Sequence, residues 1–245
     1  MPARNDQPLI TVITVAFNAE KSIERTIQSV VAQDYGHIEY IIIDGGSKDN
    51  TVDIIKKYAD KIAFWISEPD NGIYDAMNKG IDKTKGDWVY FLGAGDIMLN
   101  VAGKISPLLK NNSTVYYGDV YRLDFLRLYD GRFSPFKLAV NNICHQAIFY
   151  PATALKKYKY NTKYKLQADH NLNMQLYGDK QFRLKYIPIV VCNYEGAGYS
   201  EANWDKPFFR DKMSIIRENF SFTIYLYAQL RRLIAKKIKK IDYTA

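Results

Sequence analysis

The stretch Glu68-Pro-Asp-Asn-Gly-Ile-Tyr-Asp-Ala-Met-Asn-Lys-Gly-Ile81 predicts a loop that turns into a helix. Its first half holds three residues that fit poorly inside a helix or a central strand and so indicate a tight turn: Pro69, Asn71 and Gly72. In its second half an apolar residue recurs every four positions, which predicts one apolar helix face: Ile73, Met77 and Ile81. Asp75 and Lys79 are left on or near the open side of this helix.

A strand that ends at a carboxylate follows this helix. Trp88-Val-Tyr-Phe-Leu92 predicts a buried strand, and the chain then runs out into Gly93-Ala-Gly-Asp96. Small residues at the carboxyl end of a strand let a ligand approach the backbone, and a carboxylate there can hold a metal ion. An ordinary strand-turn-helix unit with solvated charges would fit the same stretch.

The chain before this unit alternates between strands and helices. Three apolar runs predict buried strands: Leu9–Phe17, Ile38–Ile43 and Ile62–Ile66. Helices that begin near Ser22 and Val52 separate these runs. This alternation indicates βαβ units, and therefore an α/β fold with a Rossmann-like, mostly parallel central sheet flanked by helices. Ligands bind beyond the carboxyl ends of such strands, where four polar residues are expected: Asn18, Asp44, Asp75 and Asp96.

Strand patterns in the second half of the chain are less regular. Alternating residues predict a strand at Val115–Tyr121, and residues 122–132 fit its hairpin partner. Asn142–Phe149 predicts another strand, with His145 and Gln146 near its start.

The remainder of the second half is expected to be a helix, a strand and then further helices. Leu166–Tyr177 predicts a helix with Asp169 at its start, and Phe182–Val191 predicts a strand. No internal repeat and no clean linker divides the chain. We therefore expect one domain over residues 1–220, followed by a helical extension over residues 221–245.

Composition and charge restrict the class of protein. Hydrophobic residues make up 47% of the 245 residues, which is ample for a sizeable core. Of the net charge of +8, six positive charges lie in Arg231–Lys240, which leaves about +2 (8 − 6) for the rest of the chain. Cys144 and Cys192 lack a metal-ligand spacing, so a reduced, cytoplasmic protein is the simpler expectation. Neither a signal peptide nor a membrane-spanning run is evident.

Four motifs in order resemble the inverting glycosyltransferases of family 2, which have the GT-A fold. The motifs are Thr11-Val-Ile-Thr-Val-Ala-Phe-Asn18, Ile43-Asp-Gly-Gly-Ser-Lys-Asp-Asn-Thr51, Asp70-Asn-Gly-Ile-Tyr-Asp-Ala-Met-Asn-Lys-Gly80 and Phe91-Leu-Gly-Ala-Gly-Asp96. His145-Gln146 and Ala168-Asp169 follow in the family's order. The resemblance spans residues 9–200, and each motif alone would be a weak signal.

The resemblance implies a UDP- or dTDP-sugar donor. The residues implied for nucleotide-sugar binding are Val15, Phe17, Asn18, Asp44, Asp75, Lys79 and Asp96. Asp44 would accept a hydrogen bond from the imide N–H of the base, against which Val15 and Phe17 would pack. The next two, Asp75 and Lys79, would approach the ribose or the diphosphate.

The resemblance also implies a divalent cation, Mn²⁺ or Mg²⁺, and a general base. Asp96 would hold the cation against the diphosphate, with His145 as a second ligand or His170 as the alternative. Asp169 would take the proton of the acceptor hydroxyl as that oxygen attacks, and Gln146 would contact the acceptor.

The chain departs from the family pattern at the metal motif. Many members carry Asp-x-Asp where this chain has Gly93-Ala94-Gly95 before Asp96, so metal dependence is less certain than in those members. Three of the proposed site residues could also have a purely structural role. Asp44 could cap the loop that follows it, Asp169 could be a helix N-cap, and His145 could be a structural histidine.

The basic tail predicts an amphipathic helix. Its apolar residues fall on one face: Leu230, Leu233, Ile234, Ile238 and Ile241. Such a helix suits an anionic membrane surface, reached through Arg231–Lys240, and would bring the protein to the inner face of the membrane. The alternatives are packing on the main domain or on a second subunit, as in a homodimer. No pattern supports nucleic-acid binding.

The function that these expectations favour is transfer of a sugar to a hydroxyl of a glycan or a polyprenyl-linked acceptor, in cell-surface polysaccharide synthesis. A regulatory protein that binds sugar nucleotides without transferring the sugar is the alternative, because the metal motif is reduced. A nucleotidyltransferase would normally carry a glycine-rich basic loop after the first strand, and none follows Asn18.

Overall fold

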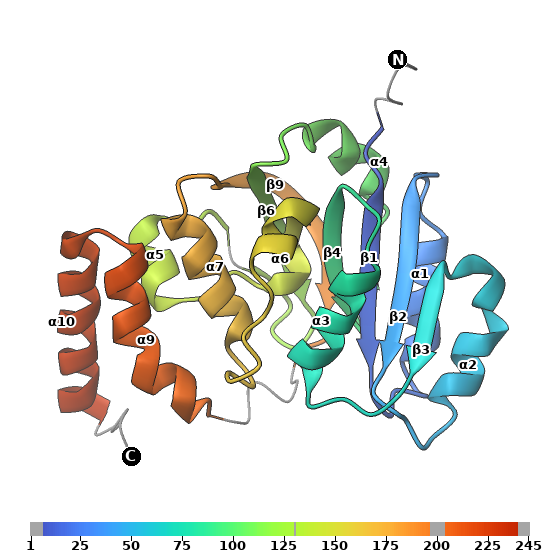
Figure 1. Cartoon of the computed structure of the whole chain (residues 1–245), viewed down its shortest axis with the longest axis horizontal. Helices are drawn as coiled ribbons and strands as arrows, with labels where there is room; N and C mark the ends of the chain where they lie inside the picture. The colour runs from blue at the N-terminus through green and yellow to red at the C-terminus, as the bar shows by residue number, and fades with distance from the viewer. Residues whose placement is uncertain (1–6, 130, 197–203, 240–245) are drawn as a thin grey trace.

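The structure, a computed structural model, describes residues 7–129, 131–196 and 204–239. Within these residues a nine-stranded sheet has the strand order β3-β2-β1-β4-β8-β6-β9-β5, and β7 pairs with β6. Helices cover the sheet, and α9 and α10 lie at one end of the molecule (Figure 1). The predicted α/β class and the helical C-terminal extension are confirmed.

The first half of the chain forms the parallel part of the sheet. Its strands are β1 (Ile10–Ala16), β2 (Ile38–Asp44), β3 (Phe64–Ser67) and β4 (Trp88–Gly93), and the pairs β1–β2, β1–β4 and β2–β3 are all parallel. Its helices are α1 (Ile23–Val31), α2 (Thr51–Lys57) and α3 (Ile73–Lys83). The carboxyl ends of these strands therefore share one edge of the sheet, the lower edge in Figure 1.

The second half of the sheet is mixed. Its strands are β5 (Ile97–Met98), β6 (Thr114–Arg122), β7 (Arg127–Tyr129), β8 (Ile148–Pro151) and β9 (Arg183–Tyr194). β8 is antiparallel to both β4 and β6, whereas β9 is parallel to β6 and antiparallel to β5. The parallel pairs β1–β2, β1–β4, β2–β3 and β6–β9 are the longest in the sheet, so the expectation of a mostly parallel sheet is confirmed, and the antiparallel pairs are short. The predicted hairpin partner of β6 is β7.

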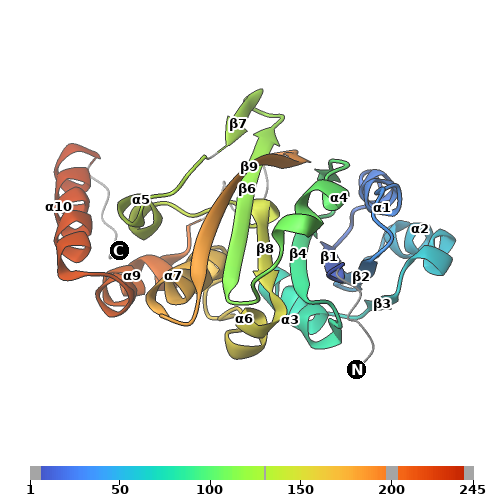
Figure 2. The ribbon, with the colours of Figure 1, turned by 90° about the horizontal axis from the view of Figure 1, so that it is seen from above.

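The remaining helices surround this mixed half. They are α4 (Ala102–Ile105), α5 (Pro135–Val140), α6 (Ala152–Lys157), α7 (Ala168–Gly178), α9 (Lys206–Asn219) and α10 (Phe222–Lys239). α7 packs on α9, and α10 packs on both α5 and α9. Seen from above, α1, α2 and α4 lie on one side of the sheet, and α3 and α6 lie on the other (Figure 2).

Two hydrophobic cores hold these layers together, one on each face of the sheet. Side chains alternate along a strand, so Val12 of β1 belongs to one core and Ile13 to the other. The core beneath α3 and α7 is closed by aromatic contacts, including Phe91 with Tyr150 at 6.2 Å between ring centroids. The opposite core contains the stacked pair Tyr90 and Phe149 at 4.8 Å.

Two sequence-based expectations about local structure are wrong. The predicted strand at residues 142–149 is a strand only from Ile148 onward, because His145–Ala147 forms a turn of 3₁₀-helix. Ile73 was expected on the apolar face of its helix but is 43% exposed, and the buried face of α3 begins at Tyr74. The structure describes Gly196 and Trp204, while the loop between them lies outside the described residues.

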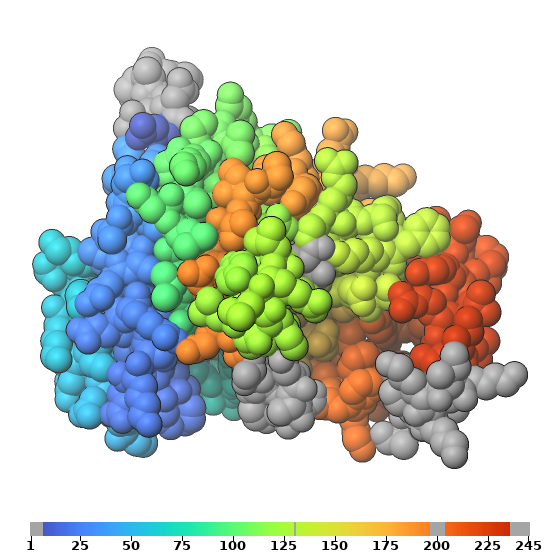
Figure 3. All heavy atoms as spheres, turned by 180° about the vertical axis from the view of Figure 1, so that it is seen from behind, coloured from blue at the N-terminus to red at the C-terminus, as the bar shows by residue number. Residues whose placement is uncertain are grey.

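The apolar face of α10 does not pack on the main domain. Leu230 is 58% exposed and Leu233 is 64% exposed, whereas Ile224 and Ala228 of the same helix are buried. The alternative that this apolar face packs on the main domain therefore does not hold for Leu230 and Leu233. The side chains of Ile238 and Ile241, expected on the same face, lie outside the described residues. In the space-filling view, α10 lies at the end of the molecule away from β1 and α2 (Figure 3). No described helix is both long and apolar enough to cross a membrane.

Candidate active site

Asn18 and Phe17 form the end of β1 at the carboxyl edge of the sheet. The Asn18 backbone adopts a φ of 48°, a left-handed conformation that asparagine tolerates better than most residues. Its N–H donates to Ser47 Oγ at 2.8 Å, and its side-chain oxygen accepts from Lys48 N–H at 2.9 Å. These bonds tie the end of β1 to the loop after β2. Phe17 is 64% exposed, so its ring is open to a ligand.

The Asp44 carboxylate organises the loop that follows β2. It is fully buried and accepts hydrogen bonds from Gly46 N–H at 3.1 Å and from Ser47 N–H at 2.9 Å. The hydroxyl groups of Ser47 and Ser67 also donate to it. Asp44 therefore does cap this loop, as its structural reading expected. Its contact with a nucleotide base stays a prediction, and that contact would require one of these bonds to be exchanged.

The loop before α3 is held by its own acidic side chains and by Lys79. Asp75 accepts from Asn71 N–H at 3.0 Å. Lys79 Nζ lies 2.8 Å from a Glu68 carboxylate oxygen and 2.9 Å from the Pro69 carbonyl oxygen. The hydrogen bond to Glu68 raises the pKa of Lys79, so this side chain is a cation at neutral pH. Binding of Asp75 and Lys79 to the ribose or the diphosphate stays a prediction.

Asp96 is buried just beyond the end of β4. The carboxylate is 5% exposed and accepts from Gln146 Nε2 at 2.8 Å and from Glu195 N–H at 3.0 Å. Burial raises the pKa of Asp96, although these two hydrogen bonds and the charge of His145 oppose the rise. A Cβ on Gly93 would lie 2.7 Å from Asp96 Oδ2, so this glycine makes room for the carboxylate. Gln146 thus contacts the expected metal ligand, and its contact with the acceptor stays a prediction.

Asp169 lies in the first turn of α7 and is almost fully buried. Its Oδ1 accepts from Tyr74 Oη at 2.9 Å and from His170 N–H at 2.8 Å, and its Oδ2 lies 3.4 Å from His145 Nδ1. Burial alone would raise the pKa of Asp169, but His145, Tyr74 and the His170 N–H together hold it below its usual value. Asp169 is therefore ionised at neutral pH. The N-cap of α7 is Gln167, so Asp169 is not a capping residue.

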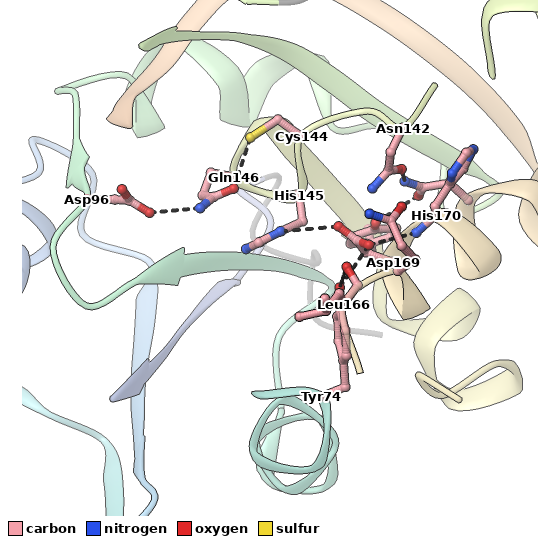
Figure 4. Close-up of polar contacts among 12 residues, drawn as sticks. Tyr74, Asp96, Asn142, Cys144, His145, Gln146, Leu166, Asp169 and His170 are labelled. Carbon is pink, nitrogen blue, oxygen red and sulfur yellow. Dashed lines mark hydrogen bonds and ion pairs between the residues drawn. The ribbon is translucent and has the colours of Figure 1, made fainter. Parts of the chain in front are cut away.

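His145 lies between the two carboxylates. Its Nδ1 faces Asp169, while its Nε2 is buried without a hydrogen-bond partner in the structure. Figure 4 shows that Asp96, His145 and Asp169 lie in a row, with His145 between the two carboxylates. His170, which was predicted as the alternative metal ligand, lies on the far side of Asp169. Its Nε2 is 2.8 Å from the Leu138 carbonyl oxygen. His170 is thus used in the core, which disfavours it as the alternative metal ligand.

α3 connects the two groups of site residues. Tyr74 binds Asp169, and the next residue, Asp75, binds the loop that carries Asn71. Lys165, just before α7, donates to the Asn71 carbonyl oxygen at 2.9 Å. The loop before α3 and the start of α7 are therefore held side by side.

Sequence reasoning missed two residues of this site. Tyr74 was quoted within the Asp70–Gly80 motif but was given no role, and only the fold shows that it reaches Asp169. Glu195 follows β9, donates its N–H to Asp96 and pairs with Arg25 at 2.5 Å. A carboxylate that follows a strand was a signal that could have drawn attention to Glu195.

The residues present can supply part of a metal site. The Asp96 carboxylate is a suitable ligand for Mn²⁺ or Mg²⁺. The Nε2 of His145 is buried without a partner in the structure, but it is a nitrogen ligand, which Mg²⁺ seldom takes. Within the described residues no group of three or more His, Cys, Asp or Glu side chains is placed to hold a metal ion. Further ligands would therefore have to come from water or from the phosphates of a donor, as is usual for Mg²⁺ bound with nucleotides.

The fold is that of the GT-A glycosyltransferases. Residues 11–123 match the sequence profile described as Glycosyl transferase family 2. A glycosyltransferase of Mycobacterium tuberculosis, described as uncharacterized, is 48% identical over 88% of this chain and 86% of its own length. The chain therefore belongs to glycosyl transferase family 2 and is a glycosyltransferase.

Further comparisons agree with this assignment. A PGL/p-HBAD biosynthesis glycosyltransferase of Mycobacterium tuberculosis is 29% identical over 94% of this chain and 93% of its own length. The crystal structure of S. aureus TarS superposes with a TM-score of 0.70 at 16% identity, covering 86% of this chain and 40% of TarS. This chain thus spans less than half the length of TarS, and at this identity the match shows the fold alone.

Structures similar to this chain have been solved with ligands. TarS 1-349 in complex with UDP-GlcNAc matches with a TM-score of 0.67 at 17% identity, over 85% of this chain and 66% of that one. The mannosyltransferase PcManGT from Pyrobaculum calidifontis, in complex with GDP-Man and Mn²⁺, matches with a TM-score of 0.63 at 15% identity, over 92% and 65%. Both share the fold described above.

Proposed function

We propose that this chain is an inverting glycosyltransferase that moves a sugar from a UDP-sugar, or a dTDP-sugar, to a hydroxyl of a glycan or lipid-linked acceptor. The observation that supports this most is the row of Asp96, His145 and Asp169, which lies beyond the end of β4 and beside the start of α3. One carboxylate in this row would hold a cation against a leaving diphosphate, and the other would accept the proton of an attacking hydroxyl.

Asp169 would act as the general base. It is ionised, and Tyr74 and His145 hold the carboxylate in one orientation. As the acceptor oxygen attacks the anomeric carbon, its proton passes to Asp169. The bond from that carbon to the diphosphate oxygen breaks on the opposite face, and its electron pair leaves with the nucleoside diphosphate. A single displacement of this kind inverts the anomeric centre.

A divalent cation would be held by Asp96 and His145 Nε2. The fit rests on two observations: burial keeps the Asp96 carboxylate out of bulk water, and His145 Nε2 is buried without a partner. The cation would neutralise charge that develops on the departing diphosphate. Gln146 and the Glu195 N–H would orient the Asp96 carboxylate, while Tyr74 would position Asp169.

Two observations support the choice of a uridine or thymidine nucleotide. Phe17 offers an exposed ring just after β1, and one structural neighbour was solved with UDP. Another neighbour was solved with GDP-Man, so guanine is the competing base. Thermal stabilisation by UDP, dTDP and GDP in the presence of Mn²⁺ tests the choice. A larger shift with GDP than with UDP would refute it.

The basic amphipathic helix α10 would bring the enzyme to an anionic membrane at its cytoplasmic face. The exposed leucines of α10 and the flanking Arg231 and Arg232 support this placement. A lipid-linked acceptor would then present its hydroxyl at the same surface. Association of two copies through α10, as a homodimer, is the competing outcome, and the molar mass in solution separates the two.

The variant Asp169→Asn tests the proposed reaction. Loss of the base should lower kcat by about 10²- to 10⁴-fold, with donor binding retained. Asp82→Asn is a matched control, because Asp82 lies on the exposed side of α3 and pairs with Lys159. Equal transfer rates for wild type and Asp169→Asn would refute the role of Asp169. Retention of the anomeric configuration in the product would refute inversion.

A further inference from the structure

The side-chain amide of Gln146 joins Asp96 to a cysteine thiol. Gln146 is 5% exposed, and its Nε2 donates to Asp96 Oδ2 at 2.8 Å. On the other side of the amide, the Cys144 thiol donates to Gln146 Oε1, with Sγ at 2.9 Å from that oxygen. Figure 4 shows Gln146 between the sulfur of Cys144 and the carboxylate of Asp96. The three side chains therefore form one chain of hydrogen bonds.

The chemistry of the carboxylate decides which way the Gln146 amide must face. A carboxylate that holds a cation is ionised and only accepts hydrogen bonds, so the group that faces Asp96 has to be the NH₂. Gln146 Oε1 then points away from Asp96, and a buried acceptor of this kind needs a donor. The Cys144 thiol supplies that donor. An amide rotated by half a turn would place two acceptors, Oε1 and the carboxylate, against each other.

The backbone of Gln146 is held by contacts of its own. Its carbonyl oxygen accepts from Tyr90 Oη at 2.9 Å, and Cys192 Sγ lies 3.7 Å from the same oxygen. The Ala147 N–H donates to the Cys144 carbonyl oxygen at 2.9 Å, which fixes this turn through backbone atoms alone. Removal of the Cys144 thiol therefore leaves the turn in place, and its effect falls on the orientation of the amide.

Each oxygen of the Asp96 carboxylate receives one N–H from the protein. Gln146 Nε2 donates to Oδ2, and the Glu195 N–H donates to Oδ1 at 3.0 Å. A carboxylate oxygen can accept about two hydrogen bonds or ligand contacts, so each oxygen keeps a lone pair for a cation. Donors on both oxygens also fix the plane of the carboxylate, as outer contacts do for metal ligands in general.

We propose that Cys144 is a positioning residue for the cation site: its thiol holds the Gln146 amide in the orientation that presents Nε2 to Asp96, and so keeps the carboxylate turned toward the cation. This inference rests on the proposed function and deepens it, because it names a residue that acts on the cation site through another residue. Cys144 itself touches neither substrate nor cation in this proposal.

The orientation of the amide can be measured in the metal-free protein by NMR. In full-length protein labelled with ¹⁵N-glutamine, the Gln146 NH₂ signals are those that disappear in Gln146→Leu. We expect slow hydrogen exchange for these signals in wild type, because one N–H is bound to a buried carboxylate. Cys144→Ala should lose the slow exchange, and Cys144→Ser should restore it, because a hydroxyl also donates. Equally slow exchange in wild type and Cys144→Ala would overturn the inference.

The affinity for Mn²⁺ in the presence of UDP is the second measurement. Cys144→Ala should weaken Mn²⁺ binding about ten-fold or more, the usual effect of removing a group that orients a metal ligand. Cys144→Ser should return the affinity to near the wild-type value. If Cys144→Ser binds Mn²⁺ as weakly as Cys144→Ala, the packing of the sulfur and not its hydrogen bond is responsible, and the inference is overturned. Should Cys144→Ala fail to fold, Cys144→Val replaces it, since valine fills the space but cannot donate.

The matched control is Cys192→Ala, which removes the other thiol next to Gln146. Cys192 contacts the carbonyl oxygen and not the amide, and it is fully buried, so this variant should lose stability but keep its affinity for Mn²⁺. An equal loss of affinity in Cys192→Ala and Cys144→Ala would overturn the inference.

A double-mutant cycle tests whether Cys144 acts through Gln146. In the Gln146→Leu background the amide is gone, so Cys144→Ala should cause no further loss of Mn²⁺ affinity. Losses that add up in the double variant would show that the thiol acts by another route, and would contradict the proposal.

The inference and the proposed function can fail separately. Equal Mn²⁺ affinities for wild type and Asp96→Asn would refute the cation site of the proposed function, while the NMR measurement needs no metal and still decides whether Cys144 orients the amide. Tight binding of Mn²⁺ that depends on Asp96 but is unchanged in Cys144→Ala would refute only the role of Cys144.

Discussion

At the scale of single residues, the site is built from carboxylates that differ in environment. Asp44 is saturated by hydrogen bonds from its own loop, so its burial is fully compensated. Asp96 is buried with fewer donors, and its pKa rises, whereas Asp169 has enough partners to hold its pKa down. Environment thus separates the expected metal ligand from the expected base, which the residue type alone could not do.

Asp96→Asn should remove stabilisation by metal ions. In wild type, Mn²⁺ that binds the folded state and not the unfolded chain adds about 2.7 kcal/mol at 100 times its dissociation constant. The amide is a poorer ligand, so the melting temperature of the variant should not respond to Mn²⁺ with UDP. The measurement is a thermal melt with and without Mn²⁺. Asp87→Asn, a change at the opposite end of β4, should leave the response intact.

His170→Gln should flatten the acid dependence of stability. Burial and the charge of Lys212 lower the pKa of His170 from 6.5 to about 3, so the folded protein keeps this ring neutral. The unfolded chain takes up a proton below pH 6.5, and stability from this group is lost as pH falls from 6.5 toward 3.

The loss can reach about 1.4 kcal/mol per pH unit for one group. Urea unfolding of wild type and His170→Gln at neutral pH and near pH 5 measures it, and a glutamine amide can still donate to Leu138. His37→Gln, which replaces a partly exposed histidine before β2, should keep the wild-type slope. Equal slopes for wild type and His170→Gln would contradict this account.

At the scale of elements, the mixed half of the sheet depends on a close contact between the backbones of β6 and β9. β6 and β9 are parallel with shifts of register on both sides of Gly118 and Asp119. A Cβ on Gly118 would lie 2.4 Å from the Ile189 carbonyl oxygen, which belongs to backbone and cannot move aside freely. The same bulge lets β9 continue to Glu195, whose N–H binds Asp96.

Gly118→Ala should therefore destabilise the protein by about 1–3 kcal/mol, the usual range for overpacking a core. The Gly118→Ala variant should also gain less stability from Mn²⁺. The added Cβ pushes β9 away, and this movement displaces Glu195, whose N–H binds Asp96. Gly36→Ala is the control, since a Cβ there meets no atom within 4 Å. Urea unfolding measures both variants. Equal free energies of unfolding for the two would show that β9 moves aside without loss of stability.

At the scale of the whole molecule, α10 is attached by one side and leaves the other side open. Ile224 and Ala228 face α5 and α9, while the apolar face that carries Leu230 and Leu233 points outward. Since Leu230 and Leu233 are more than half exposed, the double variant Leu230→Gln/Leu233→Gln should change the free energy of unfolding by no more than about 0.5 kcal/mol.

The same double variant should lose most of its binding to anionic vesicles. The two measurements together show whether these leucines act at the surface or in the core. Ile224→Gln is the contrasting variant, because it buries an amide in the core and should cost stability instead. A large loss of stability in the double variant would show that this apolar face packs against protein in solution, for example in a dimer, whose molar mass light scattering would detect.

The sequence by itself determined the strands and helices of the first half and the four family motifs. It did so because buried strands are continuous apolar runs and because the turns need glycine, asparagine and proline at fixed places. The order of motifs was enough to predict the GT-A fold and to place Asp44, Asp75 and Asp96 after strands or at the start of a helix.

Only the tertiary structure decided which side chains meet. Tyr74 reaches Asp169 across 95 positions, and Gln146 reaches Asp96 across 50, and no local pattern encodes such distances. It also decided that His145 and Gln146 lie in a turn and that the apolar face of α10 remains uncovered. The physical reason is that local propensity sets the backbone of each element, whereas contacts between distant elements depend on how all of them pack.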